Sequence, residues 1–398
     1  MSQMKISVKH LYSIVQMLYW ITACTLCGYA VVYLEYRGLS STMIGIVVGG
    51  GACLSIVVQP MIAQLTDKIP RLTVKRMIQL LIIIMATLVM VMTFLPLPIG
   101  GVMVIYTVLY MLNTCVTPFL SAMGMEFMNC GYHLDFGVSR GLGSLAYASF
   151  AAFLGFIIEK TYPGVLGFIY LIWAVILFVF ISAMEDLGDR QKTTESQRRY
   201  ETEENMLQIV LKNPSMLRLM IGFCLMNLSN QVAITYMVNI VDNLGGSGST
   251  LGIANFVSAA SEMPIMLMFA YLLTKTNCIR LLKVSAVFYV LKPILLFSAG
   301  SIPMALLGFG MQGLSFGLFT PAAVYFVNSA IEPEKRVKGQ AVFSMVTGGL
   351  ATCIGNFMGG WMQDAFGLEM LLIVCAVIAL AGAMVMITLP ESNAKKKN

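Results

Sequence analysis

Ionisable side chains inside long apolar segments are the residues of this sequence that could do chemistry. Glu126 and Arg140 lie at the facing ends of two neighbouring apolar segments, while Glu262 and Lys292 lie within two others. A charge within a lipid bilayer costs about 2.5–3.5 kcal/mol on insertion scales, so it usually has a partner and a function. We therefore treat these four side chains as the core of a candidate site.

Glu126 and Arg140 have the chemistry to recognise a polar ligand. A carboxylate and a guanidinium fork can accept hydrogen bonds from vicinal hydroxyls and donate to them, or clamp a polar molecule. The alternative is a salt bridge that pins the ends of two helices together. The sequence leaves both interpretations open.

Glu262 and Lys292 each lie beside a proline, Pro264 and Pro293. A helix interrupted by proline suits a hinge or the wall of a cavity. The carboxylate could carry a proton, with the lysine as its charge partner. The alternatives are a carboxyl group hydrogen-bonded to neighbouring backbone and a lysine that snorkels to the membrane surface.

A charged loop follows the second apolar segment and is a candidate gate. Asp67, Lys68 and Arg71 open it, and Lys75 and Arg76 close it. A charge network here could latch one face of the molecule and break during a conformational change. The alternative is the ordinary excess of basic residues in cytoplasmic loops.

The elements that must position these residues are membrane-spanning helices. The chain has 398 residues, 58% of them hydrophobic and only 11% charged, and its mean hydropathy is +0.82. A span needs about 20 consecutive apolar residues. The expected spans are 11–34, 43–64, 77–96, 100–123, 139–158, 164–184, 216–241, 250–273, 281–299, 302–328, 340–362 and 369–389.

Six spans on each side of one polar stretch predict two related halves. We expect an N-terminal six-helix bundle over 1–184, a cytoplasmic linker over 185–215 and a C-terminal six-helix bundle over 216–398. A small residue four positions before a polar one recurs at the ends of the second, fifth, eighth and eleventh spans. The copies are 63–68, 155–160, 270–275 and 360–364. The pattern predicts three-helix units in 3+3 inverted repeats.

Charge placement predicts the orientation. With the N-terminus inside, the loops that carry most Lys and Arg residues face the cytoplasm, and the outer loops keep only Arg37 and Lys160. Both termini are then cytoplasmic. The first apolar run is too long for the core of a signal peptide and no small-residue cleavage pattern follows it, so it is expected to remain as a span.

Several function classes find no support in the sequence. There is no paired nucleophile and base, no nucleotide-binding loop and no cluster with metal-ligand spacing, so we expect neither an enzyme nor a cofactor. Cys24 and Cys27 form a C-x-x-C inside an apolar helix, where packing is the expected role. The basic residues are scattered over short loops, which argues against nucleic acid. The short hydrophilic segments argue against a receptor or scaffold.

The residues resemble the lactose-permease-like branch of the major facilitator superfamily, the oligosaccharide:proton symporters. The best stretches are Gly45 to Lys68 and Asp135 to Gly155. The resemblance implies an all-α membrane protein of twelve transmembrane helices. It also implies that Glu126 and Arg140 bind sugar hydroxyls and that Tyr147, seven residues beyond the arginine, stacks on a sugar ring. Glu262 and Lys292 match the eighth-span glutamate and the ninth-span basic residue.

The tenth span departs from that family. The permease carries a His and a Glu tied to proton coupling there, and Gln312 and Ser315 stand nearest to those positions. Neither side chain titrates near neutral pH, so any proton coupling would rest on Glu262 or Glu126. Other polar residues within spans could line a cavity. They are Asn113, Asn227, Asn230, Gln231 and Gln312.

The expected function is secondary transport by alternating access around a central cavity, with proton-coupled uptake of a sugar or oligosaccharide first. Asn230, Gln231 and Gln312 are expected to bind substrate together with Glu126, Arg140 and Tyr147. The alternatives are a nucleoside, aromatic-acid or drug transporter of the same superfamily, including an exporter. The expected partners are a small molecule, protons and lipid. The expected location is a bacterial inner membrane, and the expected functional unit is a monomer.

Overall fold

All described secondary structure is helical in the computed structural model. It describes residues 8–69, 71–134, 136–187, 213–330, 343 and 349–390, except the side chains of Asp67, Asn129, Ala270, Asn328 and Ser329. The chain divides into two compact units, one of Met1–Leu39 with Gly50–Thr202 and one of Ser40–Gly49 with Glu203–Asn398. The domain limits expected from the sequence, 1–184, 185–215 and 216–398, are not tested by this division and stay a prediction.

The helices follow the apolar segments of the sequence. Before residue 187 they are α1 (Val8–Ala23), the π-helical η1 (Cys24–Gly28), α2 (Ala30–Tyr36), α3 (Ser41–Lys68), α4 (Val74–Phe94), α5 (Ile99–Asn129), α6 (Phe136–Lys160) and α7 (Val165–Ala183). After residue 213 they are α10 (Pro214–Thr235), α11 (Met237–Asn243), α12 (Gly248–Lys275), α13 (Cys278–Phe297), α14 (Ile302–Gly310), the π-helical η2 (Gly313–Gly317), α15 (Leu318–Ala330) and α17 (Ala351–Ile387).

Ten helical segments of the described chain are long and apolar enough to cross a membrane. Within lipid every backbone N–H and C=O must bond inside its own segment, which a helix achieves. The protein is therefore a multi-pass membrane protein. The predicted linker between 188 and 212, the C-terminal tail and most of 340–348 lie outside the described residues.

Two predicted spans meet at a break inside α17. Gly367 has a φ of 79°, a left-handed conformation that glycine adopts without strain. The break separates residues 351–366 from 368–387. It lies between the predicted spans 340–362 and 369–389.

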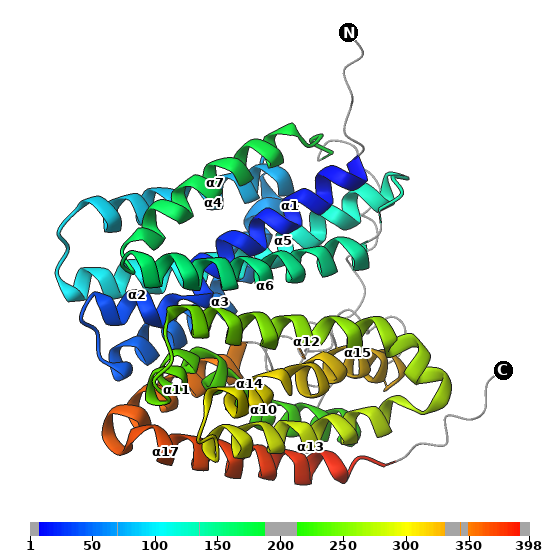
Figure 1. The fold of residues 1–398 in the computed structure, drawn as a ribbon. Coiled ribbons are helices and arrows are strands. Elements are labelled where there is room, and N and C mark those ends of the chain that lie inside the picture. Colours follow the sequence, from blue (N-terminus) through cyan, green and yellow to red (C-terminus); the bar gives the residue numbers. More distant parts are fainter. Residues whose placement is uncertain are drawn as a thin grey trace. The chain divides into compact units, whose positions relative to one another are not determined.

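In the first unit, α1 packs against α6 and α7, and α4 packs against α5 and α7 (Figure 1). The π-helical turn η1 interrupts the first predicted span, for which the apolar pattern predicted one continuous helix. The Tyr106 hydroxyl of α5 donates to the Leu26 carbonyl within η1 at 2.6 Å. The Tyr29 hydroxyl just beyond donates to the Ala151 carbonyl of α6 at 2.6 Å. These bonds tie the irregular turn to two neighbouring helices.

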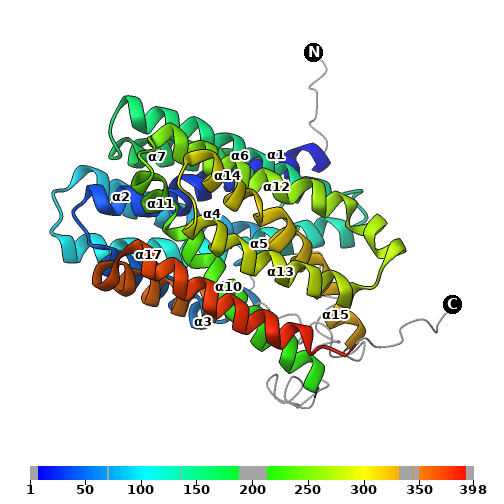
Figure 2. The same ribbon diagram turned by 60° about the horizontal axis from the view of Figure 1, so that its bottom comes forward.

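In the second unit, α10 lies alongside α17, and α13 packs against the same helix (Figure 2). Ser40–Gly49 groups with this unit, and the Thr42 backbone N–H donates to Asp364 Oδ2 at 2.7 Å. The carboxylate thus bonds one of the N–H groups that the first turn of α3 leaves without a helical partner.

The closest helix approach relevant to the candidate site is between η2 and α12. A Cβ on Gly313 would lie 2.1 Å from the Ser261 carbonyl oxygen, and a Cβ on Gly317 would lie 3.1 Å from Glu262 Cα. The Gly313 N–H also donates to Ser261 Oγ at 3.0 Å. Small residues four apart let two helices touch backbone to backbone in lipid. Gly313 and Gly317 therefore fix the position of Glu262 against the tenth predicted span.

We expect Gly313→Ala to destabilise the protein because the new methyl would overlap the Ser261 carbonyl. Overpacking of this kind costs about 1–3 kcal/mol, equivalent to about 2–4 °C per kcal/mol in a unit of this size. Thermal unfolding in detergent measures it. Gly310→Ala, whose methyl would meet only Val257 Cγ1 at 3.4 Å, is the matched control. Equal melting temperatures for the two variants would contradict this packing.

Candidate functional site

Lys292 is buried inside the second unit, with 1% of its surface exposed. Its Nζ donates to Asn230 Oδ1 at 2.8 Å and to Gln312 Oε1 at 2.6 Å. An ammonium carries donors only, so both amides must turn their oxygens toward it. The lysine therefore does not snorkel, and two amide oxygens from two other helices replace part of its water shell.

Glu262 joins the same cluster through Gln312. The amide nitrogen Nε2 of Gln312 donates to Glu262 Oε1 at 3.0 Å. One glutamine thus contacts the ammonium with its oxygen and the carboxylate with its nitrogen. The sequence predicted Lys292 and Glu262 as partners, and the structure places an amide between them.

Four helical elements bring this cluster together. Asn230 comes from α10, Glu262 from α12 and Lys292 from α13, while Gln312 directly precedes η2. A π-helical turn rotates the residues on its two sides relative to each other, and such turns are frequent at functional sites. Asn230 and Gln312 are each 3% exposed, so they are held away from bulk water together with Lys292, while Glu262 is half-buried.

Arg140 forms the second polar cluster, in the first unit. Its guanidinium carbon lies 3.9 Å from the centre of the Trp20 ring of α1, and its Nη1 donates to Ser144 Oγ at 2.7 Å. Both residues are half-buried, and cation–π contacts contribute about 0.5–2 kcal/mol from exposed to desolvated sites. Tyr147 lies edge-on to the same indole, with ring centres 6.3 Å apart. Arg140 and Tyr147 therefore meet through Trp20.

Trp20 is the residue of this cluster that sequence reasoning missed. A tryptophan in an apolar helix gives no polar signal, so nothing in the pattern singled it out. Its ring fits because the facing position on α6 is Gly143, where a Cβ would lie 2.4 Å from Trp20 Cδ1. Positions 140, 143, 144 and 147 share one face of α6, and Trp20 covers that face.

The other predicted site residues have separate surroundings. Glu126 is half-buried on α5, and its pairing with Arg140 stays a prediction. Gln231 is half-buried on α10. Asn113 donates through Nδ2 to Cys27 Sγ at 3.2 Å, and its backbone carbonyl accepts from the Tyr19 hydroxyl at 2.9 Å. Among the residues that the structure describes, no group of three His, Cys, Asp or Glu side chains could hold a metal ion.

The pattern of the MFS_1 like family matches residues 10–374, which is most of the chain. The chain belongs to this family. It is thus a member of the major facilitator superfamily, a family of transporters and not of enzymes.

Two curated relatives are distantly similar. An uncharacterized transporter, YwbF of Bacillus subtilis (strain 168), is 22% identical over 250 residues, which cover 62% of this chain and 60% of that protein. A maltose permease of Geobacillus stearothermophilus is 21% identical over 157 residues, 39% of this chain and 40% of that protein. The chain thus matches less than two thirds of the length of each relative.

Solved structures resemble the chain over nearly its whole length. The nucleoside transporter NupG matches with a TM-score of 0.79 at 14% identity, covering 98% of this chain and 100% of that one. A bacterial homologue of the human lysosomal transporter Spinster, in an inward-facing and unoccupied conformation, matches with a TM-score of 0.74 at 13% identity, covering 96% of each chain. At these identities the likeness establishes the major facilitator fold.

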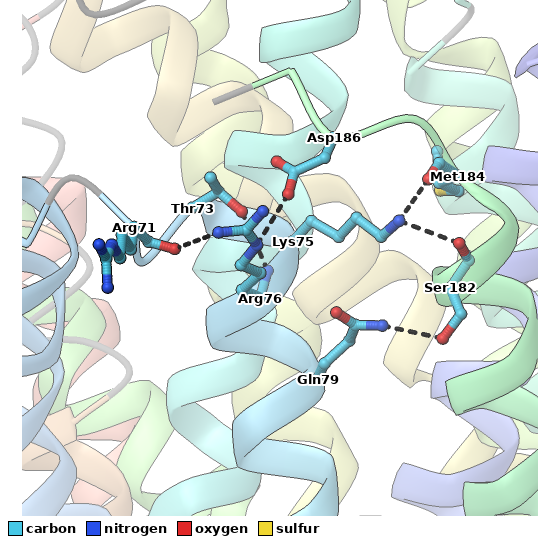
Figure 3. A network of polar contacts seen from close by, with 8 residues as sticks. All are labelled: Arg71, Thr73, Lys75, Arg76, Gln79, Ser182, Met184 and Asp186. Atoms are coloured by element: carbon cyan, nitrogen blue, oxygen red, sulfur yellow. Dashed lines mark hydrogen bonds and ion pairs between the residues drawn. The ribbon is translucent and has the colours of Figure 1, made fainter. Parts of the chain in front are cut away.

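The charged loop of this facilitator protein contacts the end of α7 (Figure 3). Arg76 Nε lies 3.0 Å from Asp186 Oδ2, and Lys75 Nζ donates to the carbonyls of Ser182 and Met184. A cation at the C-terminus of a helix is stabilised by the unpaired carbonyls there. Lys75 and Arg76 thus fasten α4 to α7 within one unit.

The three predicted gating residues take little described part in that network. The Arg71 carbonyl accepts from Arg76 Nη1 at 2.7 Å, and Lys68 is exposed. The side chain of Asp67 lies outside the described part of the chain. Their role in gating stays a prediction.

We expect Trp20→Leu to lower the melting temperature because Arg140 loses its stacking partner. The lost contact, about 1 kcal/mol, corresponds to about 2–4 °C in a unit of this size. Trp20→Phe should lose less because a ring remains. Trp361→Leu is the control, since that ring is 55% exposed and contacts Phe366. Equal losses for Trp20→Leu and Trp361→Leu in a thermal-unfolding assay would contradict a contribution from stacking.

Proposed function

We propose that this protein is a secondary transporter that takes up a small polar molecule by alternating access, coupled to protons. The observation that carries the proposal is the buried Lys292, linked through Gln312 to Glu262 inside a multi-pass membrane protein of a transporter family. Burying an ionisable side chain in a membrane protein is expensive, so a function is the better explanation for keeping Lys292.

A sugar or oligosaccharide is the first candidate substrate. The resemblance of Glu126, Arg140 and Tyr147 to sugar-binding residues supports it, as does the distant similarity to a maltose permease. Arg140 supplies donors for hydroxyl oxygens, and Tyr147 and Trp20 supply ring surfaces.

A nucleoside is the second candidate. The fold of NupG, a nucleoside transporter, matches over the whole chain. Trp20 and Tyr147 together offer two aromatic rings beside a guanidinium, which suits a flat base as well as a sugar. The proposed direction of transport is uptake, and the alternative is export.

The architecture we propose has twelve spans in 3+3 inverted repeats. Dividing α17 at Gly367 and counting α13 would raise the ten candidate spans to twelve. The proposed bundles are 1–184 and 216–398, joined by the cytoplasmic linker 185–215. We propose a bacterial inner membrane as the location, with both termini cytoplasmic and one chain as the working unit.

Uptake into proteoliposomes tests the proposal. Labelled maltose and labelled uridine are offered with and without an inward proton gradient. We expect one of them to accumulate only with the gradient, and unlabelled compound of the same kind to compete. Absence of flux for both compounds, with the protein folded, would contradict the substrate classes proposed.

We expect Glu262→Gln to lower accumulation driven by the gradient, because the amide cannot take up a proton. Couplings between two bound species are typically worth 5–150-fold, so a loss of about tenfold or more is expected. Exchange of labelled for unlabelled substrate needs no net proton movement and should fall much less. Accumulation that survives Glu262→Gln unchanged would remove this residue as the proton carrier.

A further inference from the structure

Gln312 lies between Lys292 and Glu262, an arrangement that the sequence around it does not predict. The sequence predicted a substrate contact there, but both ends of its amide are occupied by protein groups. Its oxygen accepts from Lys292 Nζ at 2.6 Å and its nitrogen donates to Glu262 Oε1 at 3.0 Å. With 3% of its surface exposed, the side chain has little area left for a ligand.

The backbone fixes this amide in place. Gln312 lies next to Gly313, whose N–H bonds Ser261 Oγ and whose missing Cβ lets η2 touch α12. Ser261 is the neighbour of Glu262 in sequence. The helix contact therefore sets the distance between the glutamine amide and the carboxylate, and Lys292 then fixes which end of the amide faces which group.

Asn230 forms the other end of the chain of contacts. Its Oδ1 accepts from Lys292 Nζ at 2.8 Å, so its Nδ2 must point elsewhere. That nitrogen is buried and has no hydrogen-bond partner among the described residues. An unsatisfied buried donor costs about 1–3 kcal/mol. Asn230 thus holds the lysine with its oxygen, while its nitrogen is a buried donor without an acceptor among the described residues.

We infer that Gln312 is a positioning residue that joins Lys292 to Glu262, so that a change of charge on the carboxylate acts on the lysine and on Asn230. When Glu262 takes up a proton from water, it loses its charge and its bond from Gln312 Nε2 weakens. The ammonium then has a neutral neighbour in place of a charged one. Gln312 thereby links the two ionisable groups without being ionisable itself.

Titratable groups of α13, and of the elements packed against α12, are the described groups that could act on Glu262. Tyr289 and Lys292 of α13 interact with it electrostatically. Among the described elements that pack against α12, α11 contributes Asp242 and α15 contributes Tyr325. Lys292 is the cation in this set. The inference rests on the proposed transport for its purpose, but it can be tested without transport.

The test is a set of double-mutant cycles read as melting temperatures of the purified full-length protein. Glu262→Gln and Lys292→Met are combined, first with Gln312 present and then together with Gln312→Leu. With Gln312 present, the two changes should be strongly non-additive, by about 5 °C or more, because each alone leaves a buried charge without its partner. With Gln312→Leu, the non-additivity should shrink to less than about half.

Gln231→Leu is the matched control, a glutamine on α10 that is half-buried. The non-additivity between positions 262 and 292 should be the same with and without Gln231→Leu. A non-additivity that survives Gln312→Leu in full would overturn the inference, because Lys292 and Glu262 would then interact without the amide.

An exchange of the two side chains separates a bridging role from a general structural one. Gln312→Glu alone adds a second carboxylate and should lower the melting temperature. Gln312→Glu combined with Glu262→Gln restores one carboxylate, one amide and one ammonium in contact, and should recover most of that loss. No recovery would overturn the inference even where Gln312→Leu fails to fold.

Transport separates this inference from the proposed function. Wild-type protein that moves neither maltose nor uridine contradicts the function and leaves the thermal cycles to decide the role of Gln312. Where the wild type accumulates substrate, Gln312→Leu should lower the ratio of gradient-driven accumulation to exchange by about tenfold. A ratio equal to that of the wild type would overturn the inference.

Discussion

An ammonium group buried inside a membrane protein must be surrounded by acceptors, and this requirement organises the second unit. Lys292 is 1% exposed and receives two amide oxygens from two other parts of the chain. Without them its desolvation would be too expensive to retain. Asn230, Gln312 and, through Gln312, Glu262 are therefore one cluster and not three separate site residues.

The helix packing explains how that cluster is built. Gly313 and Gly317 remove two side chains so that η2 can touch α12 at Ser261 and Glu262. The same logic appears in the first unit, where Gly143 makes room for the indole of Trp20 and the indole then carries Arg140. In both units a glycine on one helix makes room for a side chain of the candidate site on another.

The sequence predicted the features that the lipid environment determines, and it missed those that depend on contacts between helices. Long apolar runs predicted the helices, and rare charges within them picked out Arg140, Glu262 and Lys292, because lipid penalises such residues wherever they occur. The π-helical turns η1 and η2 were not predicted, since one extra residue in a turn leaves the apolar pattern unchanged. Trp20 was missed because an aromatic ring in a span looks like any other apolar residue. The order ammonium, amide, carboxylate depends on three helices meeting, which no local pattern encodes.

The amide between Lys292 and Glu262 allows the two charged residues to exchange places by substitution during evolution. A primary amide presents an acceptor at one end and donors at the other, and a half-turn about its last side-chain bond exchanges them. Gln312 can therefore serve a lysine on α13 and a carboxylate on α12, as here, or the same two residues with their helices interchanged. A titratable side chain at this position would carry a charge in one of its states, and would then favour one arrangement of the lysine and the carboxylate over the other. The glutamine leaves the polarity of the cluster open to reversal by two substitutions, without any change in the backbone that supports it.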